Sequence, residues 1–358
     1  MASSMSTPSE LIADPVFQLN SLLWLTQPLP DAVGIRPVLR EAGFEVDAIC
    51  PSLTLPPDIL LLLKDSGLAH QDHIRSDVVL CRQQDGRYGV VECKGNSFSP
   101  DSSTARQART LLVAVGPRLD EALGLSSGTV KRSTAGYLVA SQAAAEMDLT
   151  LQALSNELRS RKLRAGASCV LALEPGTAAL SLAADSSARD FFNLPSEKVD
   201  FVPLEEGTDP RPLYFIPYDP DCNQSEEERA YCKRVLFERI QASLLGAGGR
   251  ALPPADLVFD AVGLLNDATL GMYDLWENKE SARHMRKLVR QLLAKLAEIL
   301  RNEVGDVFRF VENKGWALQI PSESTKDAIC NALSKFSCQT MDLRQEPEPT
   351  LFDDLADE

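Results

Sequence analysis

The clearest pattern in the chain is a pair of apolar runs on either side of a turn dipeptide. Residues 77–82 (Asp-Val-Val-Leu-Cys-Arg) and 87–94 (Arg-Tyr-Gly-Val-Val-Glu-Cys-Lys) are rich in the β-branched and aromatic residues that favour strands. Asp85-Gly86 between them is a pair that favours a two-residue hairpin turn. We therefore expect an antiparallel β-hairpin over residues 77–94.

Helical and extended patterns alternate around this hairpin, while residues 51–63 fit a short helix or a strand equally well. This alternation predicts an α/β sheet that is covered by helices on both faces. The first predicted elements are a helix within 31–46, which Gly43 ends, and an extended segment at 44–49. After the hairpin we expect a helix that begins after 99–101 and that Gly116-Pro117 kinks. A strand at 135–141, a helix at 150–162 and a strand at 168–173 follow.

A stretch rich in Asp, Ser, Pro and Glu interrupts the pattern after residue 184 and indicates a domain boundary. Beyond it we expect a strand at 213–216 and long helices at 225–245 and 280–301. The predicted organisation is an N-terminal segment at 1–30, an α/β domain at 31–186, a linker at 187–212, an α+β domain at 213–345 and an acidic, disordered tail at 346–358.

Charge and composition narrow the choice of function. The 358-residue chain carries a formal net charge of −15, which argues against a protein that coats nucleic acid by bulk charge. Residues 76–165 alone carry 12 Lys and Arg against 9 Asp and Glu, so the hairpin lies in a locally basic stretch. We find no secretion signal and no membrane span, and we expect a cytoplasmic protein whose eight scattered cysteines are reduced.

The predicted hairpin brings polar residues together on strands whose other residues are mostly apolar and suited to burial. With a two-residue turn, partner numbers add up to 171, so Asp77 faces Lys94 and Val79 faces Glu92. Asp77, Glu92 and Lys94 then project from one face, and the other face carries Val78, Leu80, Val91 and Cys93. Buried carboxylates need a metal or an ion pair.

The chemistry of these three residues suits a hard divalent cation. Mg²⁺ prefers one or two carboxylates together with waters and phosphate oxygens, and Asp77 and Glu92 supply the carboxylates. Lys94 would orient the attacking water or neutralise charge that develops on the phosphate. The sequence therefore predicts a Mg²⁺ (or Mn²⁺) site for phosphodiester hydrolysis, while an ordinary exposed hairpin end is the alternative.

Asp77 followed after 14 residues by Glu92-Cys93-Lys94 resembles the PD-(D/E)xK nuclease superfamily over residues 31–173. The resemblance implies a restriction-endonuclease-like fold and a magnesium-dependent nuclease that acts on DNA, with restriction or anti-phage defence as the analogous context. It also suggests Glu41 as a further acid and Gln107 as a site residue, although Leu111 stands where one branch has tyrosine. Ser76, in place of proline, precedes Asp77.

Basic residues downstream of the motif are candidates for contacts with the nucleic-acid backbone. They are Arg106, Arg109, Arg159, Arg161, Lys162 and Arg164. The predicted helix at 280–301 also has a basic side, containing Arg283, Arg286, Lys287, Arg290 and Lys295. That side is more typical of solvated surface than of a nucleic-acid or partner site.

Other motifs are weaker. Glu312-Asn313-Lys314 repeats the Glu-x-Lys spacing but has no converging acid, so we interpret it as a solvated strand end. Gly124-Leu-Ser126-Ser-Gly128 lacks the strand-before, helix-after context of a serine hydrolase, and His70-x-x-His73 has no matching ligand pair. No phosphate-binding loop for ATP or a dinucleotide is present.

The competing class is a catalytically silent subunit that keeps the nuclease fold as a nucleic-acid- or protein-interaction module in a defence or repair complex. The acidic surface suggests a protein partner or a homo-oligomer, and no membrane partner is expected.

Overall fold

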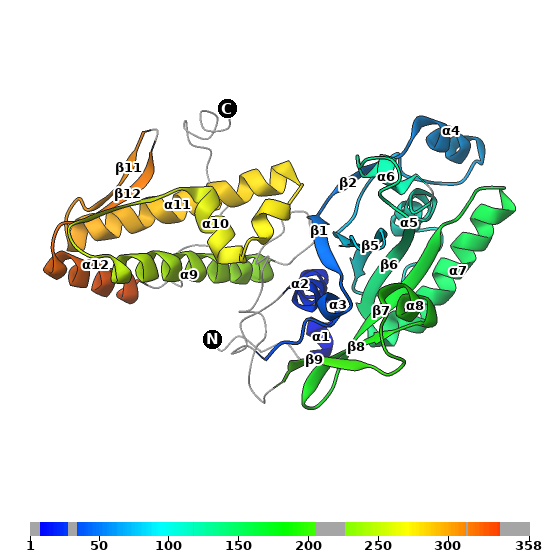
Figure 1. Ribbon diagram of the computed structural model, residues 1–358, viewed down its shortest axis with the longest axis horizontal. Helices are drawn as coiled ribbons and strands as arrows, with labels where there is room; N and C mark the ends of the chain where they lie inside the picture. Colours follow the sequence, from blue (N-terminus) through cyan, green and yellow to red (C-terminus); the bar gives the residue numbers. More distant parts are fainter. Residues whose placement is uncertain (1–7, 28–33, 117, 205–225, 313, 337–358) are drawn as a thin grey trace. The chain divides into compact units, whose positions relative to one another are not determined.

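The computed structural model describes residues 8–27, 34–116, 118–204, 226–312 and 314–336. The chain forms two compact units, one comprising Met1–Arg211 and Leu275–Asn278 and the other Pro212–Asp274 and Lys279–Glu358 (Figure 1). Within the described ranges, no helix combines the length and the apolar character that crossing a membrane requires.

A seven-stranded mixed sheet is the centre of the first unit. The middle strands β5, β6 and β7 run parallel, and the neighbours on either side are antiparallel. In spatial order the strands are β1 (Glu45–Ile49), β4 (Val78–Arg82), β5 (Arg87–Lys94), β6 (Arg132–Ala140), β7 (Ala167–Pro175), β8 (Ala179–Ala184) and β9 (Val199–Pro203). A separate two-stranded sheet pairs β2 (Ser52–Thr54) with β3 (His73–Arg75). The predicted α/β class is confirmed.

Helices cover both faces of the large sheet, as the alternating pattern predicts (Figure 1). On one face α5 (Ser103–Ala114) and α7 (Ala144–Ser160) share a hydrophobic cluster with side chains of β5 and β6. On the other face α2 (Pro15–Thr26) packs against β5, and α8 (Ser186–Phe192) packs against β7. The shorter helices are α1 (Pro8–Leu11), α3 (Val38–Glu41), α4 (Pro57–Asp65) and α6 (Leu119–Ala122).

Three predictions about this unit are wrong. The first unit begins before residue 31, because α2 is one of its most buried helices, with every residue from Val16 to Thr26 inside. It also continues past residue 186, because α8 and β9 occupy the range expected to be a linker. The helix expected within 31–46 is reduced to the four residues of α3.

The two boundary errors have different physical causes. A helix that is buried all round shows no apolar stripe for a periodicity argument to find. In α8 the apolar signal is short, but Phe191 and Phe192 pack against Phe44 with ring centroids 5.9 and 5.0 Å away. Burial of these rings joins the predicted linker to the core.

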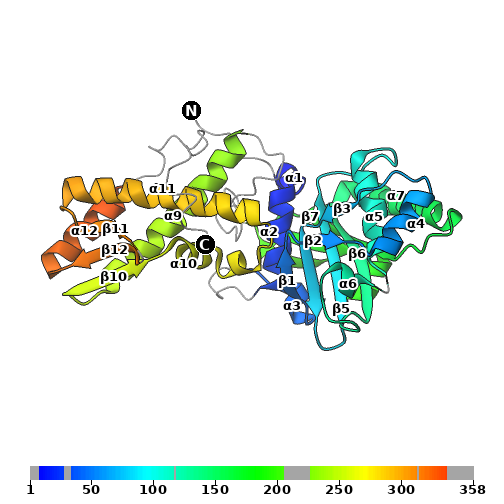
Figure 2. The same ribbon diagram turned by 90° about the horizontal axis from the view of Figure 1, so that it is seen from above.

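In its described residues, the second unit combines α-helices with a small antiparallel sheet (Figure 2). Its strand order is β10 (Ala255–Phe259), β12 (Gly315–Ile320), β11 (Phe308–Val311), and its helices are α9 (Glu226–Arg250), α10 (Ala261–Thr269), α11 (Lys279–Glu303) and α12 (Glu323–Lys335). The predicted long helices are confirmed as α9 and α11, and α11 buries its apolar side. The strand expected at 213–216 and the acidic tail lie outside the described residues.

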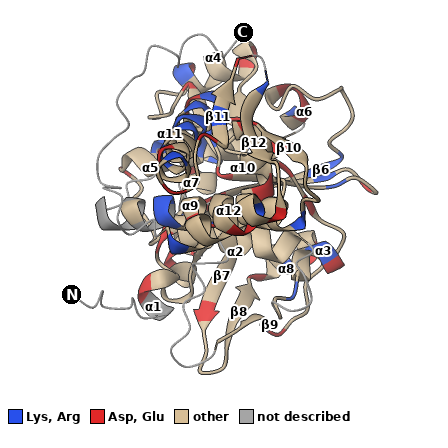
Figure 3. Ribbon diagram, turned by 90° about the vertical axis from the view of Figure 1, so that its left-hand side faces the viewer, with Lys and Arg blue, Asp and Glu red and all other residues tan. Residues whose placement is uncertain are grey.

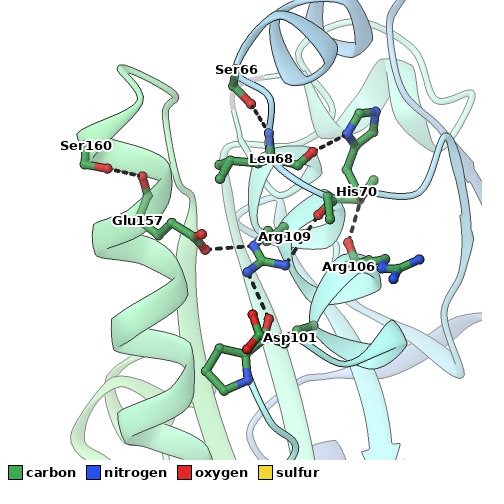
Figure 4. Close-up of polar contacts among 12 residues, drawn as sticks. Ser66, Leu68, His70, Asp101, Arg106, Arg109, Glu157 and Ser160 are labelled. Atoms are coloured by element: carbon green, nitrogen blue, oxygen red, sulfur yellow. Dashed lines mark hydrogen bonds and ion pairs between the residues drawn. The ribbon is translucent and has the colours of Figure 1, made fainter.

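An arginine inside the first unit fixes α5 in place. Figure 4 shows Arg109 extending from α5 toward Glu157 of α7, whose Oε2 lies 2.8 Å from Arg109 Nε. The same guanidinium donates to the carbonyls of Pro100 (2.9 Å) and Ala69 (3.4 Å). Because its side chain is only 6% exposed, Arg109 joins three segments rather than facing solvent.

Replacing Arg109 with methionine is expected to destabilise the protein by about 2–3 kcal/mol, because it removes a buried cation and leaves two carbonyls without a donor. Urea unfolding measures this change. The exposed Arg106, one turn earlier on α5, provides the matched control, and Arg106→Met is expected to change stability by less than about 0.5 kcal/mol. Equal effects of the two substitutions would contradict the anchoring role of Arg109.

Candidate functional site

The predicted hairpin exists, but its turn is longer than expected. β4 and β5 pair Val78 with Val91 and Arg82 with Arg87, so partner numbers add up to 169 instead of 171 and four residues, 83–86, connect the strands. The predicted two-residue turn and the placement of Asp77 opposite Lys94 are therefore wrong. Since the shift is two residues and the side-chain period of a strand is two, every residue keeps its predicted face.

A charged group within the turn accounts for the longer connection. The carboxylate of Asp85 forms ion pairs with Arg82 and, at 2.8 Å, with Arg87, the two residues that close the hairpin. Asp85 must stand beside the last cross-strand pair to make both contacts. It therefore cannot occupy the first position of a two-residue turn that extends beyond that pair.

The observed register brings the three motif residues together. Continued by one residue, it places Asp77 opposite Glu92. Asp77 Oδ2 accepts a hydrogen bond from the backbone N–H of Cys93 at 2.6 Å, and Lys94 Nζ lies 2.9 Å from Glu92 Oε2. Glu92 is 1% exposed, whereas the side chain of Lys94 is 24% exposed, so Lys94 is the more accessible residue of the pair.

Helix α5 contributes a fourth side chain. Gln107 Nε2 donates to Glu92 Oε2 at 3.1 Å and to the carbonyl of Arg75 at 2.9 Å. One amide group therefore connects α5, the segment before β4 and the buried carboxylate. Leu111, one turn further along α5, is buried in the hydrophobic cluster.

Glu41 does not join this site, and its prediction as a further acid is wrong. It pairs with Arg36 at 2.6 Å, and both side chains are about half exposed. It belongs to α3, which packs against α2 on the face of the sheet that is remote from α5. The approach of Gln107 to Glu92 places that carboxylate on the α5 face.

A residue that the sequence analysis missed holds the end of β5. Gln18, buried in α2, donates from Nε2 to the carbonyls of Lys94 (3.0 Å) and Ile12 (2.8 Å). Gly95 follows Lys94, and a Cβ atom there would lie 2.4 Å from the carbonyl oxygen of Ala13. In the sequence, Gln18 is one of three polar residues, with Asn20 and Ser21, inside the otherwise apolar run of residues 16–25.

Burial sets the electrostatics of the three charged groups. Desolvation raises the pKa of Glu92 from its ordinary 4.5 to about 7, although the nearby Lys94 opposes this shift. Desolvation likewise raises the pKa of Asp77. Burial disfavours the charged form of Lys94, but Glu92 and Asp77 outweigh it and raise the pKa of that ammonium. Lys94 is therefore a permanent cation, and Glu92 changes its charge near neutral pH.

The donor set fits a hard divalent cation. Glu92 Oε1 is buried and accepts no hydrogen bond from any described residue, so it is available to a cation. Two carboxylates suffice for Mg²⁺, which keeps several water ligands. No group of three or more His, Cys, Asp or Glu assembles in the described ranges.

The basic residues predicted to contact the nucleic-acid backbone form three groups: the exposed Arg106, the buried Arg109 and the cluster at 159–164. Arg106 is exposed beside Gln107 and stays a prediction. Arg109 is buried and bonded within the fold, so its prediction as a backbone contact is wrong.

The cluster at 159–164 lies toward the other end of the parallel strands. The chain enters β7 at Ala167, level with Gly89 of β5, and Lys94 lies five residues further along β5, roughly 16 Å away. Arg159, Arg161, Lys162 and Arg164 precede this entry point. They therefore do not belong to the site around Glu92.

The weaker motifs behave as ordinary structure. Glu312 and Lys314 are both exposed at the end of β11, which confirms the interpretation as a solvated strand end. His70 faces the carbonyl of Leu68 (2.8 Å) and the carboxylate of Asp72 (3.3 Å) rather than a second histidine.

Comparison with protein-family models, with curated proteins and with solved structures finds no match for this chain.

The buried carboxylate predicts a pH-dependent stability difference. The pKa of Glu92 is higher in the folded state (about 7) than its ordinary 4.5, so the folded protein binds more protons between these values and loses stability as pH rises through them. Glu92→Gln removes this loss. In metal-free buffer, the variant should gain about 2 kcal/mol relative to wild type between about pH 5 and about pH 8.

Denaturant titrations at the two pH values test this expectation. Glu312→Gln, at the exposed second Glu-x-Lys, serves as the control and should show no pH-dependent difference. A constant difference between Glu92→Gln and wild type at both pH values would mean that Glu92 ionises normally.

Proposed function

We propose that the first unit is a metal-dependent nuclease that hydrolyses phosphodiester bonds. The observation that carries this proposal is the convergence of Asp77, Glu92 and Lys94 from two strands, with one buried carboxylate oxygen left without a donor. A purely structural ion pair has no need of a second buried carboxylate beside it, since like charges raise the cost of burial.

Each side chain has a definite role in this proposal. Asp77 and Glu92 are the metal ligands, and a bound Mg²⁺ or Mn²⁺ would supply Lewis-acid polarisation of the phosphate and a water of lowered pKa. Lys94, cationic at all physiological pH values, orients the attacking water or neutralises charge that develops on the phosphate. Gln107 keeps the Glu92 carboxylate turned toward Lys94.

The sequence motif and the sheet support a PD-(D/E)xK, restriction-endonuclease-like assignment. Asp77 precedes β4, and Glu92 and Lys94 lie at the end of β5, where a mixed sheet carries helices on both faces. The resemblance favours DNA as the substrate, because most proteins of that superfamily act on DNA. Restriction or anti-phage defence is the context by analogy.

The second candidate is a silent subunit that binds nucleic acid or protein without cleaving. One observation favours it: Lys94 and Gln107 both engage Glu92 Oε2, so the carboxylate already has partners inside the protein. The activity test below separates the two candidates.

Purified protein is expected to cleave DNA in the presence of Mg²⁺ or Mn²⁺, and cleavage is expected to stop when EDTA removes the metal. Asp77→Asn and Lys94→Ala should each lower the cleavage rate at least about 100-fold, since each removes a group that acts on the transition state. Plasmid and linear DNA, resolved on gels over time, provide the measurement.

The second Glu-x-Lys provides matched controls for this assay. Glu312→Gln and Lys314→Ala make the same chemical changes at an exposed strand end and should leave cleavage unchanged. Wild type and site variants that leave every substrate intact would support the silent subunit, and equal cleavage by all of them would point to a contaminating nuclease.

Metal affinity is expected to depend on pH through Glu92. Below a pKa of about 7, a metal ion must displace the proton of Glu92, so Mn²⁺ affinity should fall up to roughly tenfold per pH unit. Calorimetric titration with Mn²⁺ measures this. Glu92→Gln should bind weakly at every pH; wild-type affinity in that variant would place the metal elsewhere.

A further inference from the structure

The second unit contains a cavity of about 200 Å³ that combines aromatic rings with guanidinium groups. It lies between the start of α10, the first half of α11 and the turn that joins β11 to β12. Arg286 and Arg290 line one side, Phe310 and Trp316 line another, and Asp260 completes the wall. The basic side of α11 was interpreted as solvated surface from the sequence, but two of its arginines face this cavity.

The aromatic side of the cavity is a platform formed by side chains of the β11–β12 hairpin. Phe310 and Trp316 form a cross-strand pair, with ring centroids 5.8 Å apart at 64°. The ring centroid of Trp316 also lies 5.3 Å from that of the buried Phe308, so Trp316 packs against an anchored ring. Phe310 is 61% exposed, which leaves the face of a large aromatic ring accessible.

A glycine fixes the position of this platform. Gly315 has a φ of +91°, and a Cβ atom there would lie 2.6 Å from the carbonyl oxygen of Phe259. Gly315, the first residue of β12, therefore lies directly against β10, and Trp316 follows it at the cavity wall. Only glycine combines this backbone conformation with such a close approach.

The cationic side comes from one face of α11. Arg286 and Arg290 are four residues apart and so project from neighbouring positions on the helix; Lys and Arg positions are blue in Figure 3. Arg290 forms no ion pair or hydrogen bond with any residue in the described ranges. The carboxylate of Asp260 is engaged as the cap of α10, where it accepts the N–H of Gly263 at 2.8 Å. Among the described residues, the guanidinium of Arg290 thus has no carboxylate partner in this cavity.

We propose that this cavity, the Arg290–Phe310 pocket, binds an unstacked nucleotide of single-stranded nucleic acid. The base would stack on the exposed ring of Phe310, with Trp316 inclined against its edge, and the adjoining phosphate would lie against Arg290. Aromatic stacking combined with arginine contacts to phosphate is the chemistry by which proteins hold single strands. A duplex is excluded because its bases are already stacked, and the volume is too small for a dinucleotide cofactor.

The role of this pocket in the protein rests on the proposed function, because the pocket would give the nuclease a second contact with its nucleic-acid substrate. The pocket itself contains no catalytic residue of the first unit. Binding and cleavage can therefore be measured, and can fail, independently of each other.

The test is binding of a fluorescein-labelled oligothymidylate of about ten nucleotides to the full chain, by anisotropy without divalent cations. Arg290→Ala and Phe310→Ala are each expected to weaken binding roughly 5- to 100-fold. Arg290→Ala should also reduce the slope of log affinity against log salt by about 0.7, whereas Phe310→Ala should leave the slope unchanged. Phe310→Trp should retain binding.

Arg309→Ala is the matched control. Arg309 is an exposed residue of the same strand, but alternation directs it to the opposite face of the sheet from Phe310. The Arg309→Ala variant should bind the oligothymidylate as tightly as the wild type does. Thermal melts of all variants verify that the fold is kept, which the exposure of Phe310 makes the expected result.

The outcomes separate this proposal from the nuclease assignment. Unchanged binding by Arg290→Ala and Phe310→Ala, or equal losses in Arg309→Ala, overturns the pocket whatever the cleavage assay gives. Binding that depends on Arg290 and Phe310 in a chain that never cleaves supports the pocket and overturns only the nuclease. Tighter binding of a duplex than of the single strand, unaffected by Phe310→Ala, also overturns the pocket.

Discussion

The burial of the Glu92 carboxylate is the constraint on which the rest of the first unit depends. A carboxylate taken out of water in the middle of a sheet needs compensation, and the fold supplies it from two directions. Lys94 brings a positive charge and Gln107 brings a donor from α5. Asp77, which the backbone N–H of Cys93 holds beside Glu92, adds a second negative charge and so raises the cost of burial. The effect of desolvation on Glu92 is still larger than that of Lys94 and Gln107: its pKa is raised to about 7, and one of its carboxylate oxygens accepts no hydrogen bond from a described residue.

The scaffold around that carboxylate is built to keep it in place. α5 positions Gln107, and the buried Arg109 in turn ties α5 to α7 and to the segment before α5. On the other face of the sheet, Gln18 of α2 holds the carbonyl of Lys94. The end of β5 is thus fixed from both layers of helices, which suits a site whose groups must hold a geometry that repulsion between two carboxylates opposes.

The two units carry different kinds of chemistry. The first concentrates carboxylates at the end of two strands, a surface that attracts metal ions and repels phosphates until a cation is bound. The second places arginines beside the aromatic pair Phe310 and Trp316, the groups on which the proposed nucleotide pocket depends. A chain with a net charge of −15 gains little from bulk attraction to nucleic acid, so the proposed binding depends on local cationic sites of this kind.

By itself, the sequence determined the α/β class, the hairpin and the shared face of Asp77, Glu92 and Lys94, because a period of two is a local property that survives an error of two in register. The family resemblance also suggested Gln107 as a site residue, and the structure places its amide against Glu92, while its role in the site stays a prediction. The tertiary structure decided what depends on distant partners. Asp85 lengthened the turn through its two arginines, and burial of α2 and α8 enlarged the unit at both ends. Packing also turned Arg109 inward and brought Gln18 to β5 across 76 residues of chain, contacts that no local pattern encodes.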